Sequence, residues 1–167
     1  MRNTKKLAMA GILVALGVVC SAFYIPIGAS KCFPVQHFVN VLAGVMLGPV
    51  YSLGMAFCTS LIRFMMGTGT LLAFPGSMIG AFLAGICYKT FKKTWVAAIG
   101  EVVGTGFLGA WGAYFIGLLF MGRQAAMFAL VIPFGLSSIC GSVLSFVVIQ
   151  VLEKSNIMSI HKKLESN

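Results

Sequence analysis

The sequence contains almost no acidic side chains. Its 167 residues include no aspartate and only three glutamates, at positions 101, 153 and 165. General acid–base catalysis draws on groups such as paired carboxylates, and the chain has very few of them. It also lacks the Gly-Lys-Ser/Thr ending of a phosphate-binding loop, an HExxH motif and a nucleophile elbow. These absences weigh against an enzyme and exclude a chain that hydrolyses ATP by itself.

Charge of either sign is also scarce. Charged residues make up 9% of the chain, against about 25% in soluble globular domains. Hydrophobic residues make up 59%, and the mean hydropathy is +1.01. Because so few polar residues cannot cover a surface that faces water, the composition predicts an integral membrane protein. The apolar runs are continuous rather than alternating, which favours helical spans.

Metal and disulfide patterns are missing as well. The five cysteines are scattered and form no CxxC pair, so neither a zinc site nor a disulfide framework is indicated. One weaker alternative stays open. Cys32 and His37 lie five positions apart and could bind cobalt or nickel in a metal-uptake subunit.

The apolar runs divide the whole chain, residues 1–167, into a single all-α membrane domain. A span needs roughly 20 apolar residues, so six spans with short connectors use almost the entire length. We read the first run as a retained helix rather than a cleaved signal peptide. The expected spans are Leu7–Tyr24, Pro34–Leu47, Val50–Met66, Leu71–Tyr88, Trp95–Phe120 and Ala126–Leu152.

The basic residues predict the orientation. With six spans, both termini and the connector at 89–94 lie on one side of the membrane, and nine of the twelve basic residues fall there. The positive-inside rule makes that side cytoplasmic in a multi-pass protein of the plasma membrane. Because these charges flank apolar spans, we expect contact with the bilayer rather than with nucleic acid. The other three basic residues, on the outer side, are Lys31, Arg63 and Arg123.

The stretch "SKCFPVQHFVN" gathers polar residues at the start of the second span. Gln36 and Asn40 are four positions apart and share a helix face, and His37 lies at its edge. Polar side chains facing lipid are costly, so this face should turn into the bundle. It either holds the helices together by hydrogen bonds or binds a solute, with Lys31 at the mouth.

Further polar and aromatic residues are candidates for the same outer pocket. Arg63 is either a snorkelling arginine or a site residue, and Trp111 and Tyr114 either stack on a ligand or anchor the interface. Glu101 lies in the inner half of the fifth span, where it either makes a structural hydrogen bond or stays a neutral carboxylic acid. A ligand role is the other alternative, and its depth argues against that role if the site faces outward. The full set of candidates is Lys31, Gln36, His37, Asn40, Arg63, Thr68, Thr70, Trp111, Tyr114 and Ser138.

Three long strings carry a family resemblance. "KCFPVQHFVNVLAGVMLGP", "LIRFMMGTGTLLAFPGSMIGA" and "GEVVGTGFLGA" resemble ThiW, a family of substrate-binding S components of energy-coupling factor (ECF) transporters. The resemblance implies a six-helix S-component bundle whose outer site is capped by the loop between spans one and two. It also implies a transmembrane T subunit and two cytoplasmic ATPases as partners, no cofactor, and hydroxyethylthiazole, a thiamine precursor, as the solute.

A small-residue pattern in the first span suggests where partners dock. Gly11 and Ala15 are four positions apart and Ala8 precedes them, and small residues at this spacing let another helix approach closely. The resemblance gives this pattern the role of a docking face. A neutral heteroaromatic alcohol would need hydrogen-bond groups such as Gln36 and Asn40 but no counter-charge. A structural subunit without a solute remains the other alternative.

Overall fold

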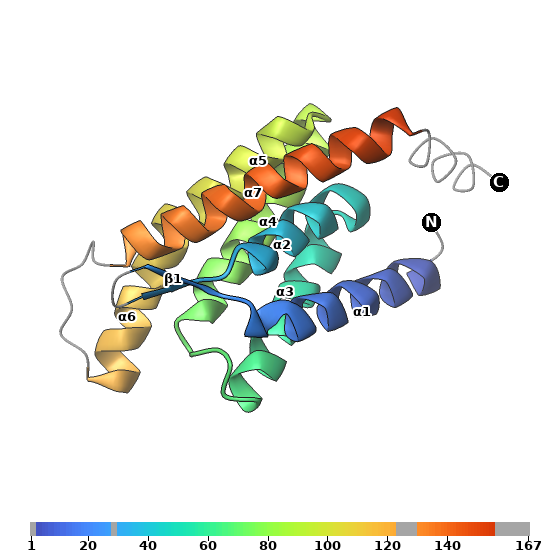
Figure 1. Cartoon of the computed structure of the whole chain (residues 1–167). Helices are drawn as coiled ribbons and strands as arrows, with labels where there is room; N and C mark the ends of the chain where they lie inside the picture. Colours follow the sequence, from blue (N-terminus) through green and yellow to red (C-terminus); the bar gives the residue numbers. More distant parts are fainter. Residues whose placement is uncertain (1–2, 28–29, 123–129, 156–167) are drawn as a thin grey trace.

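The structure, a computed structural model, describes residues 3–27, 30–122 and 130–155. It is almost entirely helical, and six helical segments form a bundle, which confirms the expected all-α fold (Figure 1). The segments are α1 (Asn3–Val19) with the 3₁₀ turn η1 (Cys20–Ala22), α2 (Pro34–Leu47), α3 (Pro49–Met65), α4 (Ala73–Phe91), the continuous run α5 (Thr94–Val103), η2 (Gly104–Gly109) and α6 (Ala110–Met121), and α7 (Val131–Lys154).

Three of the described helical runs are long and apolar enough to cross a membrane. They are Asn3–Ala22, Thr94–Phe120 and Val131–Lys154. By contrast α2 has 14 residues and is about 21 Å long, shorter than the roughly 30 Å of a hydrocarbon core. It is buried among α3, α4 and α7, so this short helix is the centre of the bundle rather than a lipid-facing span.

Two prolines set the start of α2 and of α3. Pro34 and Pro49 each occupy the first turn of a helix, where a missing backbone N–H costs nothing. Gly48 joins the two helices with a φ of 84°, a left-handed conformation that favours glycine. The predicted helix start at Pro34 and the predicted break at positions 47–49 are therefore confirmed.

A short β-hairpin replaces the loop that was expected between the first two spans. Strand β1 (Ile25–Ile27) pairs antiparallel with β2 (Ser30–Cys32), with Ile25 opposite Cys32. The β-branched isoleucines suit a strand, and the proline between them suits the edge of a two-stranded sheet. The first helix accordingly ends at Ala22 rather than at Tyr24. Figure 1 places this hairpin at the end of the bundle opposite the start of α1 and the end of α7; we call it the hairpin end.

The fifth span contains a π-helical turn, η2, that the sequence analysis did not predict. Here α4 and η2 touch backbone to backbone. A Cβ on Gly104 would lie 2.8 Å from the Cα of Gly80, and a Cβ on Gly109 would lie 2.4 Å from the Cα of Gly76. Glycines on both helices thus permit the close approach that fixes α4 against the fifth span.

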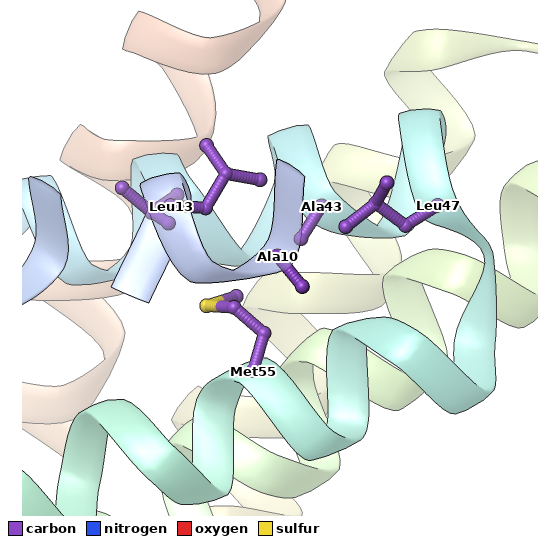
Figure 2. Packing of buried hydrophobic residues seen from close by; sticks show 6 residues of the cluster. Ala10, Leu13, Ala43, Leu47 and Met55 are labelled. Atoms are coloured by element: carbon purple, nitrogen blue, oxygen red, sulfur yellow. The ribbon is translucent and has the colours of Figure 1, made fainter. Parts of the chain in front are cut away.

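Apolar packing holds α2 in place on two sides. On one side, α1, α2 and α3 share a cluster in which Figure 2 labels Ala10, Leu13, Ala43, Leu47 and Met55. On the other side, a second cluster joins α2 to α4, α5 and α7 through Val41, Val45, Ala84, Ala97 and Ile149. Since both sides of α2 are packed, the polar residues in its first two turns have fixed positions inside the bundle.

Candidate functional site

Glu101 is the centre of a buried polar cluster. Its side chain is completely buried, and its Oε1 lies 2.8 Å from Nδ1 of His37, 3.0 Å from Nδ2 of Asn40 and 3.0 Å from Oγ1 of Thr105. The Asn40 amide donates to Oε1, and the same oxygen is within hydrogen-bond distance of the His37 ring and the Thr105 hydroxyl. We call His37, Asn40, Ser77, Glu101 and Thr105 the Glu101 cluster.

Helix α4 completes the Glu101 cluster through Ser77 and its glycines. The Asn40 amide donates to the Ser77 carbonyl oxygen at 3.2 Å, and Thr105 Oγ1 lies 3.0 Å from the Gly76 carbonyl oxygen. The carboxylate fits against α4 because residue 80 is glycine, since a Cβ there would lie 2.6 Å from Glu101 Oε2. Within the described chain Oε2 has no hydrogen-bond partner. One carboxylate therefore links α2, α4 and the fifth span.

Glu101 makes the structural hydrogen bond that was expected of it, but its partners His37 and Asn40 belong to the polar face of α2, from which its depth had been expected to separate it. Helix α2 is short and lies in the middle of the bundle. Asn40, in its second turn, consequently meets Glu101 directly. One feature of the sequence could have predicted this contact. Glu101 is the only acidic residue well inside an expected span, and an acidic side chain at such a position is expected to have a hydrogen-bonding partner.

Arg63 forms a second polar site next to the first. Its guanidinium donates to Oε1 of Gln36 and, at 3.3 Å, to the carbonyl oxygen of Thr68. The ring of Phe33 covers it, with Cζ 4.4 Å from the ring centroid. Arg63 is only 1% exposed, so it is neither a snorkelling side chain nor an interface residue. Gln36 thereby joins the polar face of α2 to α3.

The hairpin end carries a stack of two neighbouring aromatic rings with a cation at each end. The ammonium of Lys31 lies 4.3 Å from the Tyr24 ring centroid, and the Tyr24 and Phe33 ring centroids are 6.1 Å apart. On the far side of Phe33 lies Arg63. We call Lys31, Tyr24, Phe33 and Arg63 the cation–aromatic stack. It connects the hairpin to α3.

Hydrogen bonds also attach the hairpin region to α3 and α7. The backbone N–H of Phe33 donates to Oγ of Ser137 at 3.2 Å, and the hydroxyls of Ser21 and Thr68 are 3.2 Å apart. Cys32 is buried next to Ser137, and burial raises the pKa of its thiol although the hydrogen bond with Ser137 opposes the shift. These contacts fix the hairpin above the Arg63 site.

The metal alternative gains no support from this geometry. The described residues contain no group of three His, Cys, Asp or Glu side chains that could hold a metal ion. Cys32 instead contacts Ser137, and Nδ1 of His37 is bonded to Glu101.

Four of the predicted site residues lie apart from the two polar sites. Trp111 is half exposed and pairs with Phe115, as does Tyr114. Thr70 is exposed, and the buried Ser138 donates to the carbonyl oxygen of Gly135 in its own helix. The structure thus brings together Lys31, Gln36, His37, Asn40, Arg63 and Thr68, together with Glu101.

The small residues of α1 face away from the bundle. Ala8, Gly11 and Ala15 are all exposed, and a Cβ on Gly11 would meet no atom within 4 Å. This face is therefore open to another helix, and its use in docking stays a prediction.

The comparison with known families agrees with the resemblance noted from the sequence. A family model described as "Thiamine-precursor transporter protein (ThiW)" matches residues 7–155, which is most of the chain. No curated protein matches it. Together with the apolar helical bundle, this match shows that the chain is a membrane protein of the ThiW family of thiamine-precursor transporters.

Proposed function

We propose that the protein is the solute-binding S component of an ECF transporter and that its solute is hydroxyethylthiazole. The observation that carries the proposal is the polar face of α2. Gln36 reaches Arg63, and His37 and Asn40 reach Glu101, whereas the other buried polar side chains of the described chain are serine and threonine hydroxyls. A family that transports thiamine precursors needs such a face to recognise a small heteroaromatic solute.

The chemistry of these side chains suits a thiazole that carries a hydroxyethyl arm. The amides of Gln36 and Asn40 and the imidazole of His37 offer both donors and acceptors. Apolar packing around α2 provides the surroundings that a flat ring requires. The hairpin beside the Arg63 site corresponds to the capping loop implied by the sequence resemblance.

The expected orientation gives this site access from outside the cell. The basic residues near the ends of α1 and α7 and in the α4–α5 connection favour cytoplasmic termini in a plasma-membrane protein. The hairpin end then faces outward. Solute would enter there and leave on the cytoplasmic side.

Partner subunits supply the energy in this proposal. The sequence has no phosphate-binding loop of its own, so transport requires ATPases on the cytoplasmic side. We propose a transmembrane T subunit and two such ATPases, with the exposed face of Ala8, Gly11 and Ala15 as the contact with the T subunit.

Calorimetric titration of the purified protein in lipid nanodiscs tests the proposal. We expect hydroxyethylthiazole to bind with one-to-one stoichiometry and Asn40→Ala to weaken binding by at least about tenfold, or ~1.4 kcal/mol. Ser138→Ala is the matched control, because that hydroxyl bonds within its own helix and should leave binding unchanged. Binding of another vitamin precursor instead of the thiazole would refute the solute and keep the class. No binding of any precursor would refute both.

A further inference from the structure

Arg63 is a buried cation that has no acidic partner among the residues that the structure describes. The chain has only three glutamates: Glu101 is bonded to His37, Glu153 lies at the end of α7, and Glu165 follows it in the sequence. Among the described residues, the only pair of opposite ionisable groups within 4.0 Å is His37 with Glu101. No carboxylate of the described chain therefore compensates the guanidinium.

A compensating group is expected on physical grounds. Burying a charge is costly unless the charge is paired, and buried charges in proteins normally are. The groups that hold Arg63 are the Gln36 amide, the Thr68 carbonyl and the Phe33 ring, all of them neutral. These contacts orient the guanidinium, but they do not compensate its positive charge.

The guanidinium also keeps unused donors. It has five N–H groups, of which the contacts with Gln36 and Thr68 use two. Its Nε is buried and has no hydrogen-bond partner in the described part of the chain. Phe33 covers one face of the group, so the edge that carries Nε is where a ligand would bind in the plane of the guanidinium. Oxyanions bind arginine in this way.

A second cation belongs to the same arrangement. Lys31 stands at the other end of the cation–aromatic stack, separated from Arg63 by the rings of Tyr24 and Phe33. The hairpin, α3 and the connection at 66–72 contain no acidic residue. This arrangement of two cations and two aromatic rings, with no carboxylate in these segments, suits a ring that bears a negative group.

We propose that the same site also takes a thiazole that carries an oxyanion, a phosphate or carboxylate group, which binds at Arg63, is attracted by Lys31, and is held more tightly than the neutral alcohol. This inference rests on the proposed function, because it concerns the same site, and it extends the solute class from the neutral alcohol to its anionic relatives. The phosphate monoester of hydroxyethylthiazole and a thiazole carboxylate both have this chemistry. The neutral alcohol would offer Arg63 an acceptor but no charge.

The experiment compares three ligands in nanodiscs at low salt: hydroxyethylthiazole, its phosphate monoester and a thiazole carboxylate. We expect at least one of the two anions to bind about tenfold more tightly than the alcohol or better, with an affinity that falls as salt rises. The anion that binds more tightly shows whether the site prefers a phosphate or a carboxylate group. Arg63→Gln should remove the advantage of the anion, whereas Arg63→Lys should retain part of it.

Two further variants keep the test interpretable. Lys31 is exposed, so Lys31→Gln should fold normally and lower the affinity for the anion alone, even if replacement of Arg63 impairs folding. Lys89→Gln, in the last turn of α4, is the charge-matched control and should change nothing.

The outcomes separate this inference from the proposed function. Equal binding of the alcohol and both anions, unaffected by Lys31→Gln, overturns the oxyanion site and leaves the thiazole function standing. Binding of inorganic phosphate and of the phosphate ester at equal affinity, with no affinity for the alcohol, supports the oxyanion site and overturns the thiazole. Absence of binding by all these compounds overturns both.

Discussion

At the scale of single residues, the Glu101 cluster depends on small neighbours as much as on polar ones. Three polar side chains contact one carboxylate oxygen, and the other oxygen is packed against α4. The space for the carboxylate exists because residue 80 has no side chain. Gly80 is therefore as necessary to the site as the groups that bond to Glu101.

Replacing Gly80 with alanine should destabilise the protein. The new Cβ would lie 2.2 Å from Thr105 Oγ1 and 2.6 Å from Glu101 Oε2, so the cluster must move. Overpacking of this kind costs about 1–3 kcal/mol. We expect a lower melting temperature in detergent and weaker solute binding.

The matched control for this prediction is Gly54→Ala. A Cβ on Gly54, in the middle of α3, would meet no atom within 4 Å, and alanine favours helix more than glycine does. That variant should melt at or above the temperature of the unchanged protein. Equal melting of both variants would show that Gly80 is not tightly packed against Glu101.

Residue patterns in the sequence predicted part of this site. The i, i+4 spacing of Gln36 and Asn40 correctly predicted an inward polar face, since lipid exposure of both would be costly. Spacing within one helix gives no information on which helix lies opposite, so the contact of that face with Glu101 was missed. For the same reason Trp111 and Tyr114, chosen for their chemistry, lie elsewhere.

At the scale of elements, the long apolar runs predicted the helices because a run of that length has few other ways to satisfy its backbone in lipid. The hairpin has only three residues in each strand, too few for an alternating pattern to be recognised. The π turn is a change in hydrogen bonding along a run that reads as an ordinary helix. Both elements flank the polar sites.

The attachment of the hairpin to α7 gives a prediction at this scale. Ser137 supplies the acceptor for the N–H of Phe33, and Ser137→Ala removes it. Losing a hydrogen bond of this kind costs about 0.5–1.5 kcal/mol, so the hairpin should open more often. We expect faster hydrogen exchange at Phe33 and in the strands, measured by mass spectrometry.

Ser138→Ala provides the comparison one position further along α7. Its hydroxyl bonds to Gly135 and contributes nothing to the hairpin, so exchange in the strands should stay unchanged. Similar exchange in the two variants would mean that the hairpin is held by the cation–aromatic stack without help from α7.

At the scale of the whole molecule, the two ends of the bundle have different chemistry. The hairpin end carries the cation–aromatic stack, and both polar sites are reached through the first turns of α2. The opposite end holds the start of α1 and the end of α7 (Figure 1). Helix α1 packs on α2 and α3 with one face and leaves its small residues exposed on another. Recognition of the solute and docking of partners can therefore use separate surfaces.

This separation predicts that docking can be blocked without harm to the solute site. Gly11→Leu places a large side chain where nothing lies within 4 Å, so the fold should be unaffected. A close helix–helix contact at small residues would be lost, because such contacts depend on the near approach of two backbones. We expect normal binding of solute but loss of co-purification with co-expressed T subunit and ATPases. Gly54→Leu, at an exposed position of α3 where a Cβ would also meet no atom within 4 Å, should assemble normally. Full assembly of Gly11→Leu would place the docking face on another helix.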